Sequence, residues 1–502
     1  MTRSQPAACL LAIRRMQTGV IISLALYFIL MLAIGVYAWR KTAADTEGYL
    51  LAGRSLSPAV TALSAGASDM SGWLLLGLPG ALYAAGLVEA WIGIGLFVGA
   101  LVNWIVVAPR LRRQTEELGD ALTIPEFLGN RFPDKAVLLR LTSAVIVVVF
   151  FTVYTAAGMV GGGKLFATAF GGEYMTGVWI TTVVVLAYTM VGGFLAVSLT
   201  DFVQGLIMFG ALVLMPLVVM FGPGGSAGAS LTQVPVDGFL SLTQGLTAVG
   251  WLSAVTWGLG YFGQPHIIVR FMAIRSVEEV PTARNIGMGW MAVCLAGAIG
   301  VGLAGRAYVE RNGLALQDPE TIFILLANLL FHPLVTGFLY AALLAAIMST
   351  ISSQLLVSSS SLTEDFYRLV LRKQAGEREA VTVGRVSVLL VALAGIAIAA
   401  DPESEVLGLV AHAWAGFGAA FGPMIVLALT WQRMTGAGAV AGLVTGAGVV
   451  IAWIALGWDQ AFLGGPGVYE ILPGFIASWL AILVVSRIGE PGALQEPAPT
   501  IH

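Results

Sequence analysis

The stretch SAGASDMSGW, residues Ser64 to Trp73, decides how the rest of this chain is interpreted. It lies within an apolar segment, Ser57–Ala84, that is long enough to cross a bilayer, yet Asp69 stands at its centre. An Asp at the middle of a spanning helix costs about 2.5–3.5 kcal/mol on insertion scales. Gly66 and Gly72 weaken the helix further, because Gly costs about 1 kcal/mol relative to Ala. We predict that the helix is interrupted here and that its freed backbone carbonyls face a cavity and bind a small cation.

The composition is that of a polytopic membrane protein. Of 502 residues, 58% are apolar and 11% are charged, whereas a soluble domain has about 25% charged residues. The net charge of −3 indicates no class of partner, and the sequence has no basic patch typical of nucleic-acid binding. Cys9 and Cys294 lack the spacing of a transition-metal site, and the four histidines are scattered.

Runs of about 20 apolar residues predict an all-α protein with thirteen transmembrane helices. A short amphipathic piece, Asp120–Pro133, is expected at the membrane interface, and the loop Gly222–Thr243 is rich in Gly, Ser and Pro. The predicted spans are Gly19–Trp39, Ser57–Ala84, Leu87–Ala108, Leu138–Gly163, Tyr174–Gly192, Asp201–Phe221, Leu246–Ile268, Ile286–Tyr308, Leu334–Ser358, Val381–Ala399, Val406–Trp431, Gly436–Gly457 and Ile471–Ile488.

No soluble domain is predicted at either end of the chain, so residues 1–502 are expected to form a single transmembrane domain. The first residues do not have the layout of a signal peptide, because the apolar run Ala7–Ile13 is short and two arginines follow it. The sequence is compatible with translation from Met1 and with Met16 as the true start, in which case residues 1–15 are a non-native extension. The C-terminal tail Gly489–His502 is short and polar.

The Lys and Arg residues predict the orientation. With an odd number of spans the termini lie on opposite sides of the membrane. If the N-terminus is outside, 19 of the 25 Lys and Arg residues, Arg270 among them, fall in inner loops, and six, Lys164 among them, fall outside. Cytoplasmic loops carry the excess of positive charge. The N-terminus is therefore predicted outside and the C-terminus inside.

A second interruption is predicted at TWGLGYFGQPH, residues Thr256–His266. Three glycines and Pro265 lie in a membrane segment, and Pro removes a backbone donor and breaks the helix. Trp257 and Tyr261 are four residues apart, so they share a face if this turn is helical. A Gly-rich packing face is the alternative. Interrupted helices at corresponding positions in two halves of a chain favour a transporter's binding site.

A third constellation, AIMSTISS at Ala346–Ser353, places Ser349 and Thr350 in the ninth span. Ser and Thr in membrane helices usually bond back to the carbonyl four residues earlier, and that alternative stays open here. The other interpretation is that both hydroxyls turn toward an ion. Na⁺ is a hard cation that takes oxygen ligands. Two hydroxyls and three freed carbonyls make a five-oxygen cage without net charge.

These stretches resemble the sodium/solute symporter family, together with GGFLAVSLTD at Gly192–Asp201 and WAGFGAAFGP at Trp414–Pro423. The resemblance runs from about Met16 to Arg487 and is greatest to the bacterial sodium/proline symporters. It implies a LeuT-like inverted repeat of five plus five helices, with one extra helix before and two after. The repeats are then residues 57–221 and 246–431, and the two C-terminal helices are residues 436–488.

The resemblance also implies site residues, carried over by matched position. The Na⁺ ligands are the carbonyls of Ala67, Met70 and Ala346 and the hydroxyls of Ser349 and Thr350. Asp69 shapes the ion site rather than ligating directly. The substrate contacts are Ser71, Gly72, Tyr154, Trp257, Tyr261 and Pro265. Arg54 and Asp201 match family positions without an assigned role.

The implied function is Na⁺-coupled uptake of L-proline across a bacterial inner membrane by alternating access. No cofactor, transition metal, nucleic acid or obligatory protein partner is implied; the partners are L-proline, Na⁺ and the lipid bilayer. The alternative is a transporter of the same fold that carries another small solute or uses H⁺ as the coupling ion. A kinase-coupled sensor and a membrane enzyme are disfavoured, because no soluble domain and no nucleophile–base pair is found in the sequence. Glu364, Asp365 and Arg368 are expected to form a solvated helix end, and His266 is expected to be structural rather than a proton relay.

Overall fold

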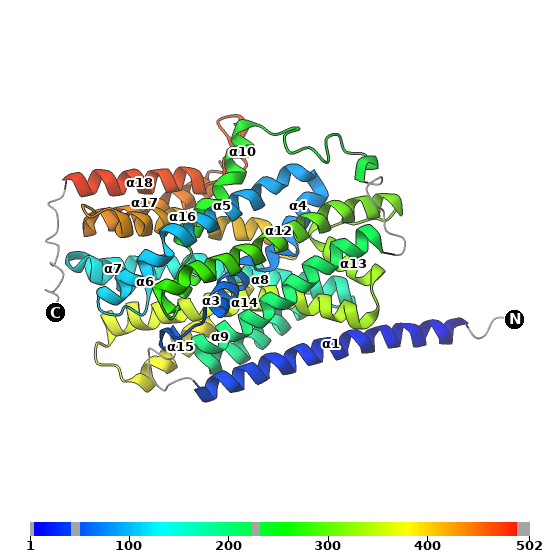
Figure 1. Cartoon of the computed structure of the whole chain (residues 1–502), viewed down its shortest axis with the longest axis horizontal. Helices are drawn as coiled ribbons and strands as arrows, with labels where there is room; N and C mark the ends of the chain where they lie inside the picture. The colour runs from blue at the N-terminus through cyan, green and yellow to red at the C-terminus, as the bar shows by residue number, and fades with distance from the viewer. Residues whose placement is uncertain (1–4, 42–50, 223–230, 489–502) are drawn as a thin grey trace.

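The computed structural model describes residues 5–41, 51–222 and 231–488, and these residues are helical almost throughout (Figure 1). Ten of the described helices are long and apolar enough to cross a membrane. Three shorter apolar helices accompany them, at residues 72–85, 174–187 and 319–330. Large apolar side chains lie on the surface, such as Leu26 and Ile29, each 62% exposed. The chain is thus a multi-pass membrane protein, while the count of thirteen spans stays a prediction.

The helices lie roughly side by side, with α1 along one edge of the bundle and α17 and α18 along the opposite edge (Figure 1). Their bounds are α1 Gln5–Lys41, α3 Pro58–Met70, α4 Gly77–Ala85, α5 Ala90–Val106, α6 Ala108–Glu117, α7 Ile124–Arg131, α8 Ala136–Phe170, α9 Tyr174–Phe221, α10 Ala248–Val255, α11 Pro265–Ala273, α12 Val280–Arg311, α13 Ile322–Leu330, α14 Pro333–Ser360, α15 Glu377–Ile398, α16 Val406–Thr430, α17 Gly436–Ala455 and α18 Ile471–Ile488. A π-helical segment, Ser361–Leu371, extends α14, and β1 (Ala461–Phe462) and β2 (Gly465–Pro466) form a small antiparallel hairpin.

The second predicted span is broken, as expected. α3 begins at Pro58, where the Ser57 hydroxyl accepts a hydrogen bond from the backbone N–H of Val60, and it ends at Met70. Ser71 then has φ 38° and ψ −169°, a conformation that L-residues rarely adopt. A single 3₁₀ turn at Gly72–Leu74 leads into α4. The carbonyls at the end of α3 therefore have no helical partners beyond Ser71.

The seventh predicted span is broken as well. α10 ends at Val255, a 3₁₀ segment runs from Thr256 to Gly263, and Gln264 is extended before Pro265 begins α11. The glycines of this segment also serve close packing. A Cβ at Gly99 of α5 would lie 2.1 Å from the carbonyl oxygen of Gly258. The break and the packing face, which the sequence offered as alternatives, are both present.

Two expectations about helix boundaries were wrong. The predicted spans Tyr174–Gly192 and Asp201–Phe221 are two helical pieces of α9 that meet at a kink at Gly193 (φ 59°, ψ −164°), and residues 194–200, expected to connect them, are helical. The bend thus needs one glycine rather than a loop, and Asp201 lies inside the helix. The stretch between the eighth and ninth predicted spans, residues 309–333, contains a further helix, α13.

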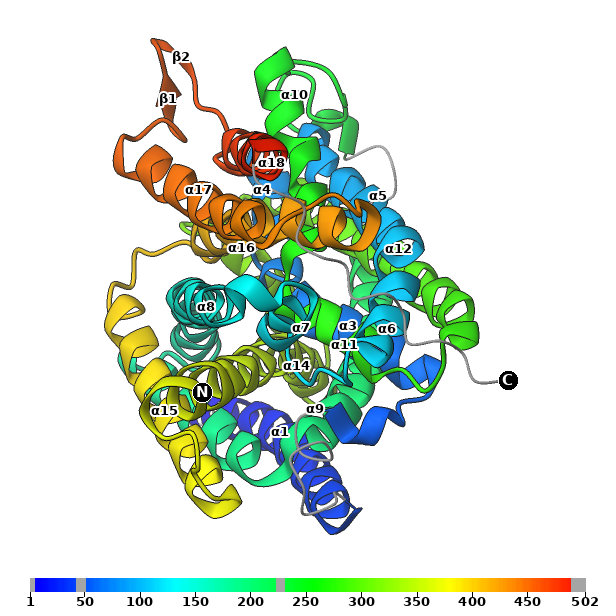
Figure 2. The same ribbon diagram turned by 90° about the vertical axis from the view of Figure 1, so that its left-hand side faces the viewer.

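The two broken helices lie in the middle of the bundle. α3 packs against α9, α11, α12 and α14, and α14 packs in turn against α1, α8 and α9. Viewed end-on, α3, α11 and α14 are surrounded by the other helices (Figure 2). Polar backbone freed at these breaks is therefore enclosed by protein, the condition under which irregular backbone is tolerated at membrane depth.

Candidate functional site

The end of α3 and the middle of α14 meet through hydroxyl groups. The Ser349 hydroxyl donates to the carbonyl of Ala67 across the helix interface at 2.8 Å and to the carbonyl of Ala346 in its own helix at 3.1 Å. The Thr350 hydroxyl donates to the Ala346 carbonyl at 3.1 Å. These residues and Met70 are at most 2% exposed. Four of the five predicted ion ligands thus share hydrogen bonds, and Met70 lies one turn along α3 from Ala67.

Back-bonding within α14 accounts fully for Thr350 but only in part for Ser349, which bonds to the Ala346 carbonyl and also to a carbonyl of α3. The bond from Thr350 to Ala346 spans four residues within α14, the pattern common in membrane helices. Ser349 also reaches a carbonyl 282 residues away in the chain. The structure brings together two oxygens, those of Ser349 and Ala67, that belong to different helices and lie beside the Ser71 break.

Asp69 points away from this cluster. It follows Ala67 by two residues, which places it about 200° around the helix. Its carboxyl group accepts a hydrogen bond from the Tyr261 hydroxyl, and its backbone carbonyl accepts one from the Tyr154 hydroxyl at 3.2 Å. The last turn of α3 therefore contacts the predicted ion residues on one side and two predicted substrate residues on the other.

Trp257 and Tyr261 lie in an aromatic cluster. The Trp257 ring stacks on Tyr469 with a centroid distance of 5.0 Å and lies 6.4 Å from Trp73. The Trp414 indole donates to the Trp257 carbonyl at 2.7 Å, and its ring meets Tyr261 edge-on at 5.1 Å. Trp414 begins the stretch Trp414–Pro423, which resembles the family but has no predicted role in the site, whereas nothing in the sequence indicated Tyr469.

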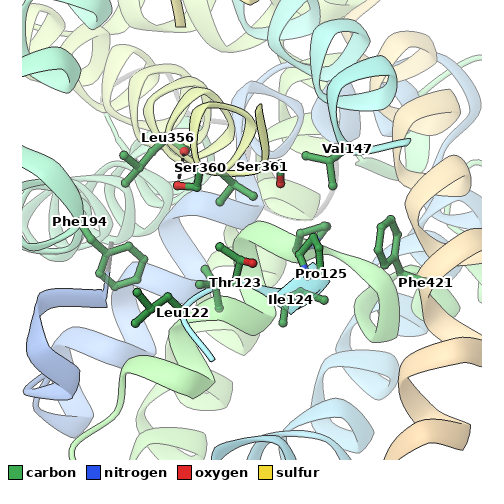
Figure 3. A pocket seen from close by; sticks show the side chains of 13 residues that line it. Leu122, Thr123, Ile124, Pro125, Val147, Phe194, Leu356, Ser360, Ser361 and Phe421 are labelled. Atoms are coloured by element: carbon green, nitrogen blue, oxygen red, sulfur yellow. Dashed lines mark hydrogen bonds between the residues drawn. The ribbon is translucent and has the colours of Figure 1, made fainter. Parts of the chain in front are cut away.

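The remaining predicted substrate residues are not all in one place. The Ser71 hydroxyl accepts from the backbone N–H of Trp73 at 3.3 Å, and a Cβ on Gly72 would lie 3.3 Å from Ile347. Pro265 lines a separate cavity of about 460 Å³ (Figure 3). The other walls of this cavity come from the residues before and within α7, from α8, α9, α11 and α16, and from the α14 end at Ser360 and Ser361. This cavity lies toward the end of the bundle that the charge pattern predicts to be inside.

Asp201 is paired with an arginine that was predicted to lie in an inner loop. Arg270 was counted among the inner-loop charges, but it is 1% exposed within α11. Its guanidinium donates to Asp201 Oδ2 at 3.0 Å and to Ser353 Oγ at 2.6 Å. The Ser64 hydroxyl also donates to Asp201 Oδ2, at 2.8 Å. A count of Lys and Arg cannot distinguish a loop charge from a buried ion pair.

Two other charged groups, one of them predicted to be solvated, are buried in ion pairs. Asp365, predicted as solvated, is fully buried and accepts from Arg140 Nε at 2.7 Å and from the Thr123 hydroxyl at 3.3 Å. Lys164, counted as an outer charge, is 7% exposed and pairs with both Asp318 and Glu320 at 2.8 Å.

Two further predicted residues are buried. Arg54 donates to the carbonyls of Met272 and Ala121 at 3.2 and 3.0 Å, so it ties the start of α3 to the end of α11. His266 is fully buried, and its ring meets Tyr154 edge-on at 5.8 Å. Neither ring nitrogen of His266 has a hydrogen-bond partner among the described residues.

A bundle of membrane-length helices, in which two helices break at a common buried centre, is an architecture typical of secondary transporters. The family model for the sodium:solute symporter family matches residues 49–446. The chain belongs to the sodium:solute symporter family.

Relatives of known name cover nearly the whole chain. It is 56% identical over 458 residues to the high-affinity proline transporter PutP of Bacillus subtilis (strain 168), covering 91% of this chain and 95% of the relative. It is 52% identical over 480 residues to a sodium/proline symporter of Staphylococcus aureus (strain JH9), covering 95% and 94%. A solved Na⁺-coupled sialic acid symporter, in a substrate-bound outward-open state, superposes with a TM-score of 0.80 at 18% identity, over 95% of this chain and 99% of that structure. The last comparison shows a shared, LeuT-like fold.

Proposed function

We propose that this chain is a Na⁺-coupled symporter that carries L-proline into a bacterial cell by alternating access. The observation that carries the proposal is the hydrogen bond of 2.8 Å from Ser349 on α14 to the Ala67 carbonyl beside the break in α3. It brings together the two elements that a cation would bridge. The names of relatives at 52–56% identity support Na⁺ as the coupling ion and L-proline as the solute.

In this proposal Na⁺ replaces the hydroxyl-to-carbonyl hydrogen bonds with ion contacts. The ligands are the carbonyls of Ala67, Met70 and Ala346 and the hydroxyls of Ser349 and Thr350. A neutral oxygen set suits a hard monovalent cation. Moving one Na⁺ inward across 100 mV releases about 2.3 kcal/mol, which is available to drive proline accumulation.

The last turn of α3 couples the ion to the solute. Ala67 faces the ion, whereas the backbone carbonyl and the carboxyl group of Asp69 accept from Tyr154 and Tyr261. An ion that orders this turn also orders the two tyrosines. Ligand coupling is reciprocal, so Na⁺ raises proline affinity and proline raises Na⁺ affinity by the same factor. In this way Asp69 shapes the site without ligating the ion.

Proline is a zwitterion with an apolar ring, and the proposed contacts match both parts. Ser71 and Gly72 lie where the backbone leaves α3 and starts the short 3₁₀ turn before α4, so the proline carboxylate is placed beside this irregular backbone and the Ser71 hydroxyl. Trp257 and Tyr261 offer aromatic faces to the ring and the cationic imino group. Tyr154 closes the pocket. Pro265, on the wall of the cavity of Figure 3, contacts the solute on its way to the inner side.

The proposed topology retains thirteen spans, with the N-terminus outside and the C-terminus inside the plasma membrane. α3 with α4 and α10 with α11 each form one broken span, and α9 contributes two spans that meet at Gly193. Residues 57–221 and 246–431 are then the two inverted repeats, and residues 436–488 are the two C-terminal helices. The matching breaks near the start of each repeat support this division.

Uptake of radiolabelled L-proline into proteoliposomes tests the function. We expect uptake when Na⁺ is higher outside, faster uptake with an inside-negative potential, and little uptake when K⁺ replaces Na⁺. A panel of other amino acids and a pH gradient without Na⁺ complete the assay. Equal uptake with and without Na⁺ would show that Na⁺ is not the coupling ion.

A further inference from the structure

A second cavity lies on the opposite side of α3 from Ser349. It is lined by α3, α5, α12 and the broken segment around Tyr261, and its empty space measures about 350 Å³ with its opening included. Most of its walls are apolar or small. The lining residues are Ala62, Ala65, Gly66, Asp69, Met70, Ala100, Asn103, Trp104, Tyr261, Ile267, Gly287, Met288 and Met291. The charged or amide side chains among them are Asp69 and Asn103.

Asn103 is the feature of this cavity that packing does not explain. It is 1% exposed, and both its amide oxygen and its amide nitrogen lack a hydrogen-bond partner among the described residues. The rest of α5 from Ala90 to Val106 is apolar apart from the indole N–H groups. Buried polar groups in folded proteins are almost always satisfied by protein, ordered water or a ligand. A satisfied Asn103 therefore requires a polar occupant of the cavity.

Asp69 indicates the charge of that occupant. Its carboxyl group accepts from the Tyr261 hydroxyl, and in the part of the chain that the structure describes no lysine, arginine or histidine pairs with it. A carboxylate and an amide oxygen facing one cavity are oxygen ligands suited to a hard cation. The cavity has room for an occupant of about the size of a water molecule.

We propose that this cavity holds a second Na⁺ ion with part of its hydration shell, between Asp69 and Asn103. The proposal rests on the proposed function, which makes Na⁺ the available ion. The two sites differ in kind: Ala67, Ser349 and Thr350 offer neutral oxygens, whereas this one includes a carboxylate. They lie on opposite faces of one helical turn, so an ion can wait at Asp69 without occupying the coupling site.

Equilibrium binding of ²²Na⁺ to the purified full-length protein in nanodiscs tests the second site. The proteins compared are the wild type, Asn103→Leu, and the double variant Ser349→Ala with Thr350→Ala. Leu fills the space of Asn without polar atoms. The matched control is Ser478→Ala, because Ser478 of α18 is also fully buried and without a partner among the described residues.

We expect two binding components in the wild type and in Ser478→Ala. Asn103→Leu should weaken one component by about tenfold or more, and the double variant should weaken the other. Asn103→Asp, which adds a carboxylate and guards against misfolding of the Leu variant, should tighten the first component by about threefold or more. Wild-type ²²Na⁺ binding in both Asn103 variants means that water alone occupies the cavity and overturns the inference.

The design separates this inference from the proposed function. One outcome is that the double variant loses a ²²Na⁺ binding component while the Asn103 variants bind as the wild type does. This outcome supports the coupling site and contradicts the second site. Unchanged binding in the double variant, with a component lost in Asn103→Leu, supports the second site and contradicts the proposed coupling site.

Discussion

Two buried carboxylates, Asp69 and Asp201, lie in the centre of this bundle at 3% and 0% exposure, and their surroundings differ. Asp201 Oδ2 accepts from Ser64 and from the guanidinium of Arg270, so the protein supplies its counter-charge. Asp69 accepts from the Tyr261 hydroxyl, and no cationic side chain in the described part of the chain pairs with it. Burying a charge is costly unless it is paired. We infer that Asp201 is part of the scaffold, whereas the partner of Asp69 is mobile.

The largest expected effect comes from removing the counter-charge of Asp201. Arg270→Met leaves a carboxylate buried without its cation, which costs about 3–5 kcal/mol of stability. We expect a large loss of folded protein in detergent and a much lower melting temperature, measured by fluorescence-detected size exclusion after heating.

The control restores the charge balance at the same place. Asp201→Asn combined with Arg270→Met removes both charges and should recover much of the lost stability, because replacing a whole buried pair is often close to neutral. If Arg270→Met alone is as stable as the wild type and changes only Na⁺ dependence, Asp201 belongs with Asp69 and the comparison fails.

The second-largest expected effect is on the apparent affinity for Na⁺. Ser349→Ala removes the hydroxyl that joins α14 to the Ala67 carbonyl. One lost ligand is expected to raise the Na⁺ concentration for half-maximal proline uptake by about tenfold, equivalent to about 1.4 kcal/mol. Ser352→Ala is the matched control, because the Ser352 hydroxyl bonds within α14 to the Ser349 carbonyl. An unchanged Na⁺ dependence in Ser349→Ala and Thr350→Ala argues against this site.

Asp69→Asn tests the other buried carboxylate of the comparison with Asp201. No protein ion pair is broken, so we expect a stability change of at most about 1 kcal/mol, the worth of the Tyr261 hydrogen bond. The Na⁺ concentration for half-maximal uptake should rise about fivefold, since the charge near the ion is lost. Melting temperature and Na⁺ titration are measured on the same preparation. A melting temperature as low as that of Arg270→Met contradicts a mobile partner for Asp69.

The smallest expected effect is that of Tyr261→Phe. The ring stays against Trp414, but the Asp69 carboxyl group loses its hydroxyl donor. We expect the half-saturating concentrations of proline and of Na⁺ to rise together by about threefold, because the tyrosine links the two sites. Uptake at varied concentrations of each measures both. A change in proline affinity alone means that Asp69 does not take part in the coupling.

The two helix breaks at the centre of the molecule could be predicted from the sequence, because each depends on residues that are close together in the chain. Asp69 among small residues and Pro265 after three glycines predict the interruptions that the structure has at Ser71 and Gln264. The family resemblance implied that Ser349 and Ala67 lie close together, and the structure has a hydrogen bond between them. The assignment of individual ligands remains a proposal.

The sequence does not show which helix faces meet, and the missed features depend on that. Arg270 resembles any basic residue at a helix end until α9 brings Asp201 to it. Asp365 resembles a solvated carboxylate until Arg140 covers it. Asn103 is unremarkable on α5 alone, and only the packing of α3 and α12 places it in a cavity with Asp69. Such pairings are set by tertiary contacts between distant segments.

The most direct test of the central claim is the binding of proline to the purified protein while Na⁺ is varied. The claim is that one turn of α3 holds the ion on one side and orders the solute pocket on the other. It predicts that the half-saturating proline concentration falls steadily as Na⁺ rises and that Ser349→Ala shifts this fall to higher Na⁺. Proline binding of equal strength with and without Na⁺ would contradict the account.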